Sequence, residues 1–198
     1  MQGERRPQVV LVRHGETEWT KTGQHTGTTD IDLTETGRRQ AERLGTVLSG
    51  RHFATVLTSP LLRAAETCRL AGLADAAEVR DDLAEWDYGA YEGRTTRDIR
   101  VERPGWSLWD DGVPGGESAD DVGQRADRLI AELRSLGGDV AVFSHGHLLR
   151  VMAARWVGLP PGGGKRLALH TATISVLGYE RETRVLVHWN QDCEPALR

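Results

Sequence analysis

Two short apolar runs in this chain end in the same way, with a histidine followed by a glycine. Residues 9–12 lead into Arg13-His14-Gly15, and residues 140–143 lead into Ser144-His145-Gly146. Short continuous runs rich in valine and other apolar residues are typical of strands that are buried on both faces of a parallel sheet. Such strands need helices on both sides, so the two runs predict a layered α/β protein.

Helical and strand patterns alternate along the rest of the chain. Thr34 can cap a helix over 35–49, in which apolar residues recur at three- and four-residue spacing. Other patterns predict strands over 8–13, 55–58, 77–80, 140–143, 174–179 and 184–188, and helices over 61–71, 118–136 and 148–157. This alternation predicts an α/β fold, a three-layer sandwich with a mostly parallel central sheet flanked by helices.

The domain organisation is predicted to be simple. A chain of 198 residues has the length of one domain, and it contains no internal repeat and no low-complexity linker. Residues 93–116 are rich in Arg, Gly, Pro and Trp and show no clean period. We therefore predict a single domain over 1–198, with 93–116 as a lid-like insertion.

Composition and charge bear on partners and location. A formal net charge of −4 argues against nucleic acid as a partner. No apolar run approaches the ~18 residues of a membrane span, and residues 1–7 leave no room for the apolar core of a signal peptide. Two cysteines exclude a disulfide scaffold. These features predict a cytoplasmic protein with reduced thiols; a homodimer stays open.

The candidate chemistry lies where the predicted strands end. Ligands of open α/β sheets bind beyond the carboxyl ends of the strands, so His14, His145 and Ser59 are expected at one edge. Arg13 precedes the first histidine, and Arg63 falls on the first turn of the helix after Ser59-Pro60. The N–H groups of a guanidinium are arranged so that they can bind two phosphate oxygens at once. A neutral imidazole can attack phosphorus. The pattern therefore indicates a small phosphorylated substrate.

Phosphoryl transfer to a histidine also needs a carboxylic acid. The acid protonates the leaving oxygen and later activates water. Spacing along the chain leaves five candidates open: Glu85, Asp87, Glu92, Glu16 and Asp82.

The longest motif resembles the signature of a known family. Residues 11–19 read LVRHGETEW, and this segment resembles the signature of the histidine phosphatase superfamily, also called phosphoglycerate mutase-like. The resemblance continues at residues 26–27, 32–37, 58–64 and 144–147, and it covers nearly the whole chain.

The resemblance implies a role for individual residues. His14 would be the nucleophile that becomes phosphorylated, and Glu85 the acid and base. The phosphoryl oxygens would be bound by Arg13, Arg63 and His145. Substrate would also contact Thr26, Gly27 and the backbone of Gly146.

One position departs from the family pattern. Thr20 stands where many members have Asn, and its hydroxyl can still donate one hydrogen bond to a phosphate. The family mechanism implies no metal and no cofactor.

The branch of the family is indicated by residues 20–27, 85–93 and 106–112. These look like the branch that holds sedoheptulose-1,7-bisphosphatase and small acid phosphatases. A chain shorter than the cofactor-dependent mutases leaves the pocket open to water, which favours hydrolysis of the phosphohistidine. We therefore expect a phosphatase that acts on a small monoester, a sugar phosphate or bisphosphate. A mutase-type phosphotransferase and a non-catalytic relative that binds a phosphorylated ligand are the alternatives.

Two further features have weaker interpretations. The predicted lid contains four arginines, which are Arg94, Arg97, Arg100 and Arg103. One of these lid arginines could bind a second phosphate of the substrate. The simpler interpretation is that all four are solvated and balanced by nearby acidic residues. The pair His145 and His147 lacks a third ligand for zinc.

Overall fold

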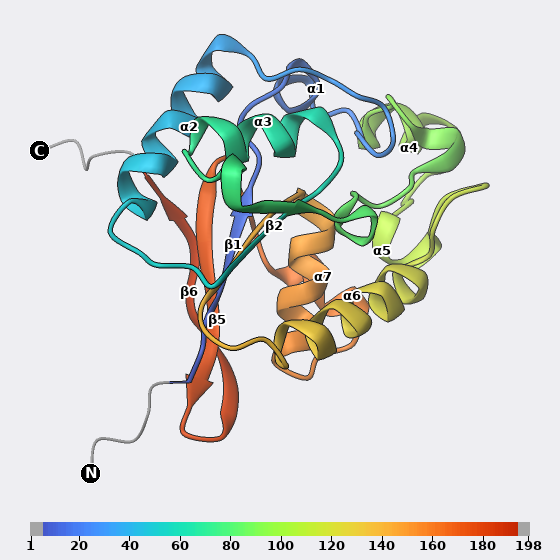
Figure 1. Ribbon diagram of the computed structural model, residues 1–198. Coiled ribbons are helices and arrows are strands. Elements are labelled where there is room, and N and C mark those ends of the chain that lie inside the picture. Colours follow the sequence, from blue (N-terminus) through green and yellow to red (C-terminus); the bar gives the residue numbers. More distant parts are fainter. Residues whose placement is uncertain (1–5, 194–198) are drawn as a thin grey trace, which may run out of the picture.

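The structure is a computed structural model that describes residues 6–193. Its centre is one six-stranded sheet with the strands β1 (Val9–Arg13), β2 (Thr55–Thr58), β3 (Ala77–Val79), β4 (Val140–Ser144), β5 (Thr173–Glu180) and β6 (Thr183–Asp192). The order across the sheet is β3-β2-β4-β1-β5-β6 (Figure 1). The first four strands in that order pair in parallel, and β5 and β6 complete the sheet antiparallel.

Helices cover both faces of this sheet. They are α1 (Glu18–Thr22), α2 (Glu35–Leu48), α3 (Leu62–Leu70), α4 (Thr96–Glu102), α5 (Leu108–Asp111), α6 (Ala119–Leu133) and α7 (Gly146–Trp156). Short 3-10 turns lie at Ala74–Ala76, Asp81–Leu83, Gly89–Tyr91 and Pro161–Arg166. Figure 1 shows α2 and α3 on one side of the strands and α6 and α7 on the other.

Strand β1 shows why the sheet needs both layers. Successive side chains of a strand point to opposite faces. Val9 and Leu11 pack in the core cluster that contains α6 and α7, whereas Val10 and Val12 pack in the cluster that contains α2 and α3. All four side chains are buried. The three-layer α/β sandwich predicted from the sequence is therefore confirmed.

The main helices begin and end close to their predicted positions. Thr34 caps α2 by accepting a hydrogen bond from the Gly37 N–H, as the sequence predicts. Helix α7 starts at Gly146, two residues before its predicted start, with His145 at the N-cap position. The difference places His145 at the junction of β4 and α7.

The segment 93–116 is more regular than its sequence indicates. It contains α4 and α5, which are too short to show an apolar period in the sequence. Helix α4 is defined instead by a capping box between Thr95 and Asp98. Trp106 and Leu108 are buried in the same core cluster as α6 and α7. The segment therefore packs on the main core.

Two further findings concern the described part of the chain. None of the helices within residues 6–193 is long and apolar enough to span a bilayer. Cys68 and Cys193 are both free thiols, and burial raises the pKa of the Cys68 thiol to about 12.

Candidate active site

The pairing of β1 with β4 brings the two histidines together. The strands are parallel neighbours with Arg13 opposite Ser144, and the His14 N–H donates to the Ser144 carbonyl over 3.1 Å. The His14 and His145 rings have centroids 5.2 Å apart. Both residues are buried. The two His-Gly motifs, 131 residues apart in sequence, thus form one site at the sheet edge.

The ring of His14 is held by its own loop. Its Nδ1 lies 2.8 Å from the Gly15 carbonyl oxygen, an acceptor, so Nδ1 carries the proton and Nε2 has a free lone pair. Burial, with the charges of Arg63 and Arg13, lowers the pKa of His14 well below its usual value. The imidazole is therefore neutral, which is the form that can act as a nucleophile.

The loop after His14 is fixed by a buried hydroxyl. Thr67 on α3 accepts a hydrogen bond from the Gly15 N–H over 3.0 Å and donates to the Arg63 carbonyl over 2.6 Å. One side chain thus ties the His14 loop to the helix that carries Arg63.

Two arginines lie next to His14 in the interior. Arg63 is fully buried and donates to the carbonyls of Thr26, Gly27 and Thr29. Arg13 donates to the Leu169 carbonyl. Burial lowers the pKa of both guanidinium groups, although the Glu85 carboxylate opposes that shift.

Several buried nitrogen atoms of this site have no hydrogen-bond partner in the described part of the protein. Among the residues that the structure describes, four buried side-chain polar atoms lack a partner, and three of them are Arg13 Nε, Arg63 Nε and His145 Nδ1. Buried polar groups are almost always hydrogen-bonded, so three open nitrogens around one imidazole indicate a binding place for an anion.

Glu85 is the carboxylate of the site. Its Oε1 accepts hydrogen bonds from the Trp86 and Leu148 N–H groups, each over 2.9 Å, and its Oε2 accepts from the His147 N–H over 2.9 Å. The carboxylate therefore sits at the start of α7, beside the His145 N-cap.

The other acids that spacing left open have structural partners elsewhere. Glu92 accepts from the Gly27 and Thr29 N–H groups, Glu16 accepts from the Thr34 hydroxyl, Asp87 accepts from the Gly89 N–H, and Asp82 pairs with Arg80. Of the five, only Glu85 lines the pocket described next.

A pocket of about 550 Å³ opens in front of His14. Predicted site residues and several residues without a predicted role line it together: Arg13, His14, Trp19, Thr20, Gly23, Gln24, His25, Thr26, Glu85, Tyr88 and His147. Trp19, His25 and Tyr88 lie within the motifs that carry the family resemblance, but neither spacing nor the resemblance assigns them a role. Arg63 and His145 are buried and are not among the residues that line this pocket; the His145 ring lies 5.2 Å from that of His14.

Three other predicted substrate contacts are Thr20, Gly27 and Gly146. The Thr20 hydroxyl is engaged in the capping box of α1, donating to the Thr17 carbonyl over 2.8 Å. The Gly27 N–H binds Glu92 and its carbonyl binds Arg63. A Cβ at Gly146 would lie 3.2 Å from the guanidinium carbon of Arg13, so glycine leaves room for that side chain.

His147 and Tyr88 form a neutral pair on the pocket wall. The Tyr88 hydroxyl lies 2.6 Å from His147 Nδ1. Burial raises the pKa of Tyr88 well above its usual value, and burial, followed by the Arg150 charge, lowers the pKa of His147. Tyr88 is thus the donor, and the remaining proton of His147 sits on Nε2.

The comparison with known families decides what this site is. Residues 9–192 match the family model described as histidine phosphatase superfamily, branch 1. The chain belongs to that superfamily. It is accordingly a phosphatase, an enzyme of the phosphoric monoester hydrolase class, acting on phosphorylated small molecules.

Individual relatives cover about three quarters or more of this histidine phosphatase. A protein named acid phosphatase from Mycobacterium tuberculosis is 45% identical over 188 residues, covering 93% of this chain and 92% of its own. A sedoheptulose 1,7-bisphosphatase from Saccharomyces cerevisiae is 41% identical, covering 77% and 68%. The solved structure of a Mycobacterium tuberculosis open reading frame has a TM-score of 0.91 at 43% identity, covering 96% of this chain and all of that one.

The lid arginines of this histidine phosphatase lie outside the pocket. Arg94 pairs with Glu102, and Arg100 donates to the Trp106 carbonyl. Arg103 donates to the Tyr91 hydroxyl, and the side chain of Arg97 is 91% exposed. None of the four is among the pocket-lining residues within the described chain.

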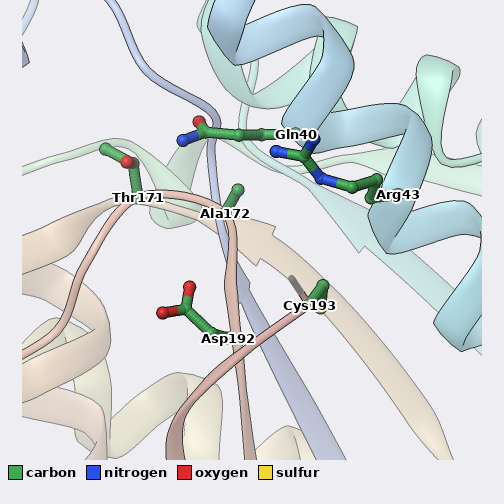
Figure 2. Close-up of a pocket in the computed structure, with 6 residues that line it drawn as sticks. All are labelled: Gln40, Arg43, Thr171, Ala172, Asp192 and Cys193. Atoms are coloured by element: carbon green, nitrogen blue, oxygen red, sulfur yellow. The ribbon is translucent and has the colours of Figure 1, made fainter. Parts of the chain in front are cut away.

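Two further features of residues 6–193 concern metals and a second pocket. This part of the chain holds no group of three or more His, Cys, Asp or Glu side chains placed to bind a metal ion. The second pocket, shown in Figure 2, is lined by Gln40, Arg43, Thr171, Ala172, Asp192 and Cys193. It contains none of the predicted site residues.

Proposed function

We propose that this histidine phosphatase hydrolyses a small phosphate monoester, a sugar phosphate or bisphosphate, through a phosphohistidine on His14. The observation that carries the proposal is the set of three open nitrogens, on Arg13, Arg63 and His145, around a neutral imidazole with a free Nε2. Phosphoryl transfer depends mainly on positioning and charge neutralisation, and these groups supply both.

In the first half-reaction, the Nε2 lone pair of His14 attacks phosphorus and the bond from phosphorus to the ester oxygen breaks. Protonated Glu85 gives its proton to that oxygen, which leaves as an alcohol. The charges of Arg13 and Arg63 stabilise the phosphoryl oxygens throughout.

In the second half-reaction, the Glu85 carboxylate takes a proton from water. The resulting hydroxide attacks phosphorus, the bond from phosphorus to His14 Nε2 breaks, and inorganic phosphate leaves. His14 and protonated Glu85 are restored. A pocket open to bulk water supports hydrolysis over return of the group to another alcohol.

The choice of a sugar substrate rests on relatives and on space. One relative is named sedoheptulose 1,7-bisphosphatase, and the pocket in front of His14, about 550 Å³ with its space open to solvent included, is where the leaving group would lie. The pocket wall offers the imidazole rings of His25 and His147, which suit the hydroxyl groups of a sugar.

The test is phosphate release from a panel of small monoesters and sugar bisphosphates, in the presence of chelator, by the wild type and by His14→Ala. We expect release that disappears in the variant, with the phosphoryl group trapped on His14 in rapidly quenched wild type. Release unaffected by the substitution would overturn the mechanism. Absence of release with transfer between phosphoglycerates would indicate a mutase, and phosphate binding without any turnover a non-catalytic relative.

A further inference from the structure

Ser59 makes a buried contact that the phosphohistidine mechanism does not require. It follows β2, and its Oγ lies 2.7 Å from His145 Nε2. Both residues are completely buried. Strand β2 is the parallel neighbour of β4, so the sheet itself sets this contact.

The direction of the hydrogen bond follows from the partners of the hydroxyl. Ser59 Oγ already accepts from the Leu61 N–H over 3.3 Å. Its own proton needs an acceptor, and within the described chain His145 Nε2 is the acceptor that lies in reach. A buried hydroxyl without an acceptor is costly, so Ser59 donates and Nε2 of His145 is unprotonated.

The tautomer of His145 follows from that direction. Burial, followed by the charge of Arg63, lowers the pKa of His145 well below its usual value, so the ring carries one proton. With Nε2 accepting, that proton is on Nδ1. His145 Nδ1 is one of the buried atoms without a partner, in a ring 5.2 Å from that of His14.

We propose that Ser59 is a positioning residue that keeps His145 in the Nδ1–H tautomer, so that this N–H donates to an oxygen of the bound phosphoryl group. The inference rests on the proposed function, because it takes His145 as a phosphoryl ligand. The opposite tautomer would turn a nitrogen lone pair toward an anion and lose that hydrogen bond.

The direct test is the tautomer itself. In ¹⁵N-histidine-labelled protein, two-dimensional ¹⁵N–¹H spectra distinguish a protonated from an unprotonated ring nitrogen, and a His145→Gln sample identifies the signals of His145. We expect Nδ1 protonated in the wild type and a mixture of tautomers in Ser59→Ala. A wild-type His145 protonated on Nε2 would overturn the proposal without reference to any activity.

The second test is the affinity for inorganic phosphate. In Ser59→Ala only the molecules in the Nδ1–H tautomer keep the hydrogen bond, so phosphate affinity falls in proportion to that fraction, by about two- to tenfold for a mixture that holds half to a tenth of it. Ser59→Thr keeps the hydroxyl and is expected to restore most of that affinity. Thr58→Val is the matched control, because it removes a neighbouring buried hydroxyl that contacts the Ser59 carbonyl and not His145.

The outcomes separate the two proposals. Unchanged phosphate binding in Ser59→Ala, or equal weakening in Thr58→Val, would contradict the role of Ser59. A protein that releases phosphate from no ester would contradict the proposed function, yet the ¹⁵N spectra and the phosphate titration would still decide the tautomer. If Ser59→Ala does not fold, the wild-type spectrum and Ser59→Thr carry the test.

Discussion

The imidazole rings of His14 and His145 lie 5.2 Å apart with their planes inclined by 58°, and they are anchored through different nitrogens. His14 is held through Nδ1 by the Gly15 carbonyl, whereas His145 is held through Nε2 by Ser59. One ring therefore offers a lone pair on Nε2 and the other an N–H on Nδ1. Two identical side chains thus take opposite chemical roles because their anchors differ.

The neutrality of His14 has a consequence for the pH profile. Its pKa is lowered well below the usual 6.5 by burial first and then by Arg63 and Arg13. A nucleophile with a lowered pKa stays unprotonated as the pH falls through 6.5. We expect kcat/KM for p-nitrophenyl phosphate to show no loss of activity centred near pH 6.5. A profile that falls with a pKa of ~6.5 on its acid side would contradict this environment for His14.

The sequence predicts the position of this site well because its key parts are local. An apolar run, a histidine and a glycine occupy consecutive positions, and parallel strands bring their carboxyl ends to one edge. Arg63 and Ser59 follow β2, so they arrive at the same edge by the same rule. The edge of the sheet that carries the site therefore follows from the order of residues along the chain.

The opposite wall of the pocket could not be derived in this way. His25 and Tyr88 lie in segments with no apolar period, and their rings meet only in the folded chain, with centroids 4.8 Å apart. The carboxylate is a similar case. Spacing cannot separate Glu85 from Glu92, because the distinction lies in which backbone N–H groups each one reaches in the folded chain.

Gly146→Ala tests the space that Arg13 needs. A Cβ there would lie 3.2 Å from the guanidinium carbon and Nε of Arg13, so the guanidinium must shift while the backbone does not. We expect phosphate binding about tenfold weaker, the size of one charge-assisted hydrogen bond, with little change in thermal stability. Gly162→Ala is the control, because a Cβ there meets nothing within 4 Å. Equal phosphate affinity in both variants would show that Arg13 is not constrained by Gly146.

Glu85→Gln tests the proton donor. An amide cannot protonate the leaving oxygen, and protonation matters least when the leaving group is already acidic. We expect alkyl phosphates to be slowed more than nitrophenyl phosphate, measured as kcat/KM for a series of leaving groups. Because the amide also replaces an oxygen that accepts backbone hydrogen bonds, circular dichroism must first show that the variant is folded. Equal slowing across the series would remove Glu85 from the acid role.

Substitutions of the lid arginines test whether they reach substrate. Arg97 is exposed and lies 4.0 Å from Asp98, and exposed ion pairs contribute about 0–1 kcal/mol. We expect Arg97→Ala to leave kcat/KM unchanged for both a sugar phosphate and the corresponding bisphosphate. Arg63→Lys, in contrast, should lower both values, because an ammonium cannot replace a fork that binds three carbonyls. A selective loss with the bisphosphate in Arg97→Ala would assign the second phosphate to the lid.

The burial of His25 predicts how stability depends on pH. Burial lowers its pKa from 6.5 to about 4, so the unfolded chain binds one more proton than the folded one between these values. Stability from this residue is therefore fully present above pH 6.5 and is lost as the pH falls toward about 4, with a slope of ~1.4 kcal/mol per pH unit. His25→Gln removes that proton while keeping a polar group near Thr96. Urea unfolding at neutral and mildly acidic pH should show a smaller loss of unfolding free energy in the variant; the same loss in both proteins would mean that His25 titrates normally in the folded state.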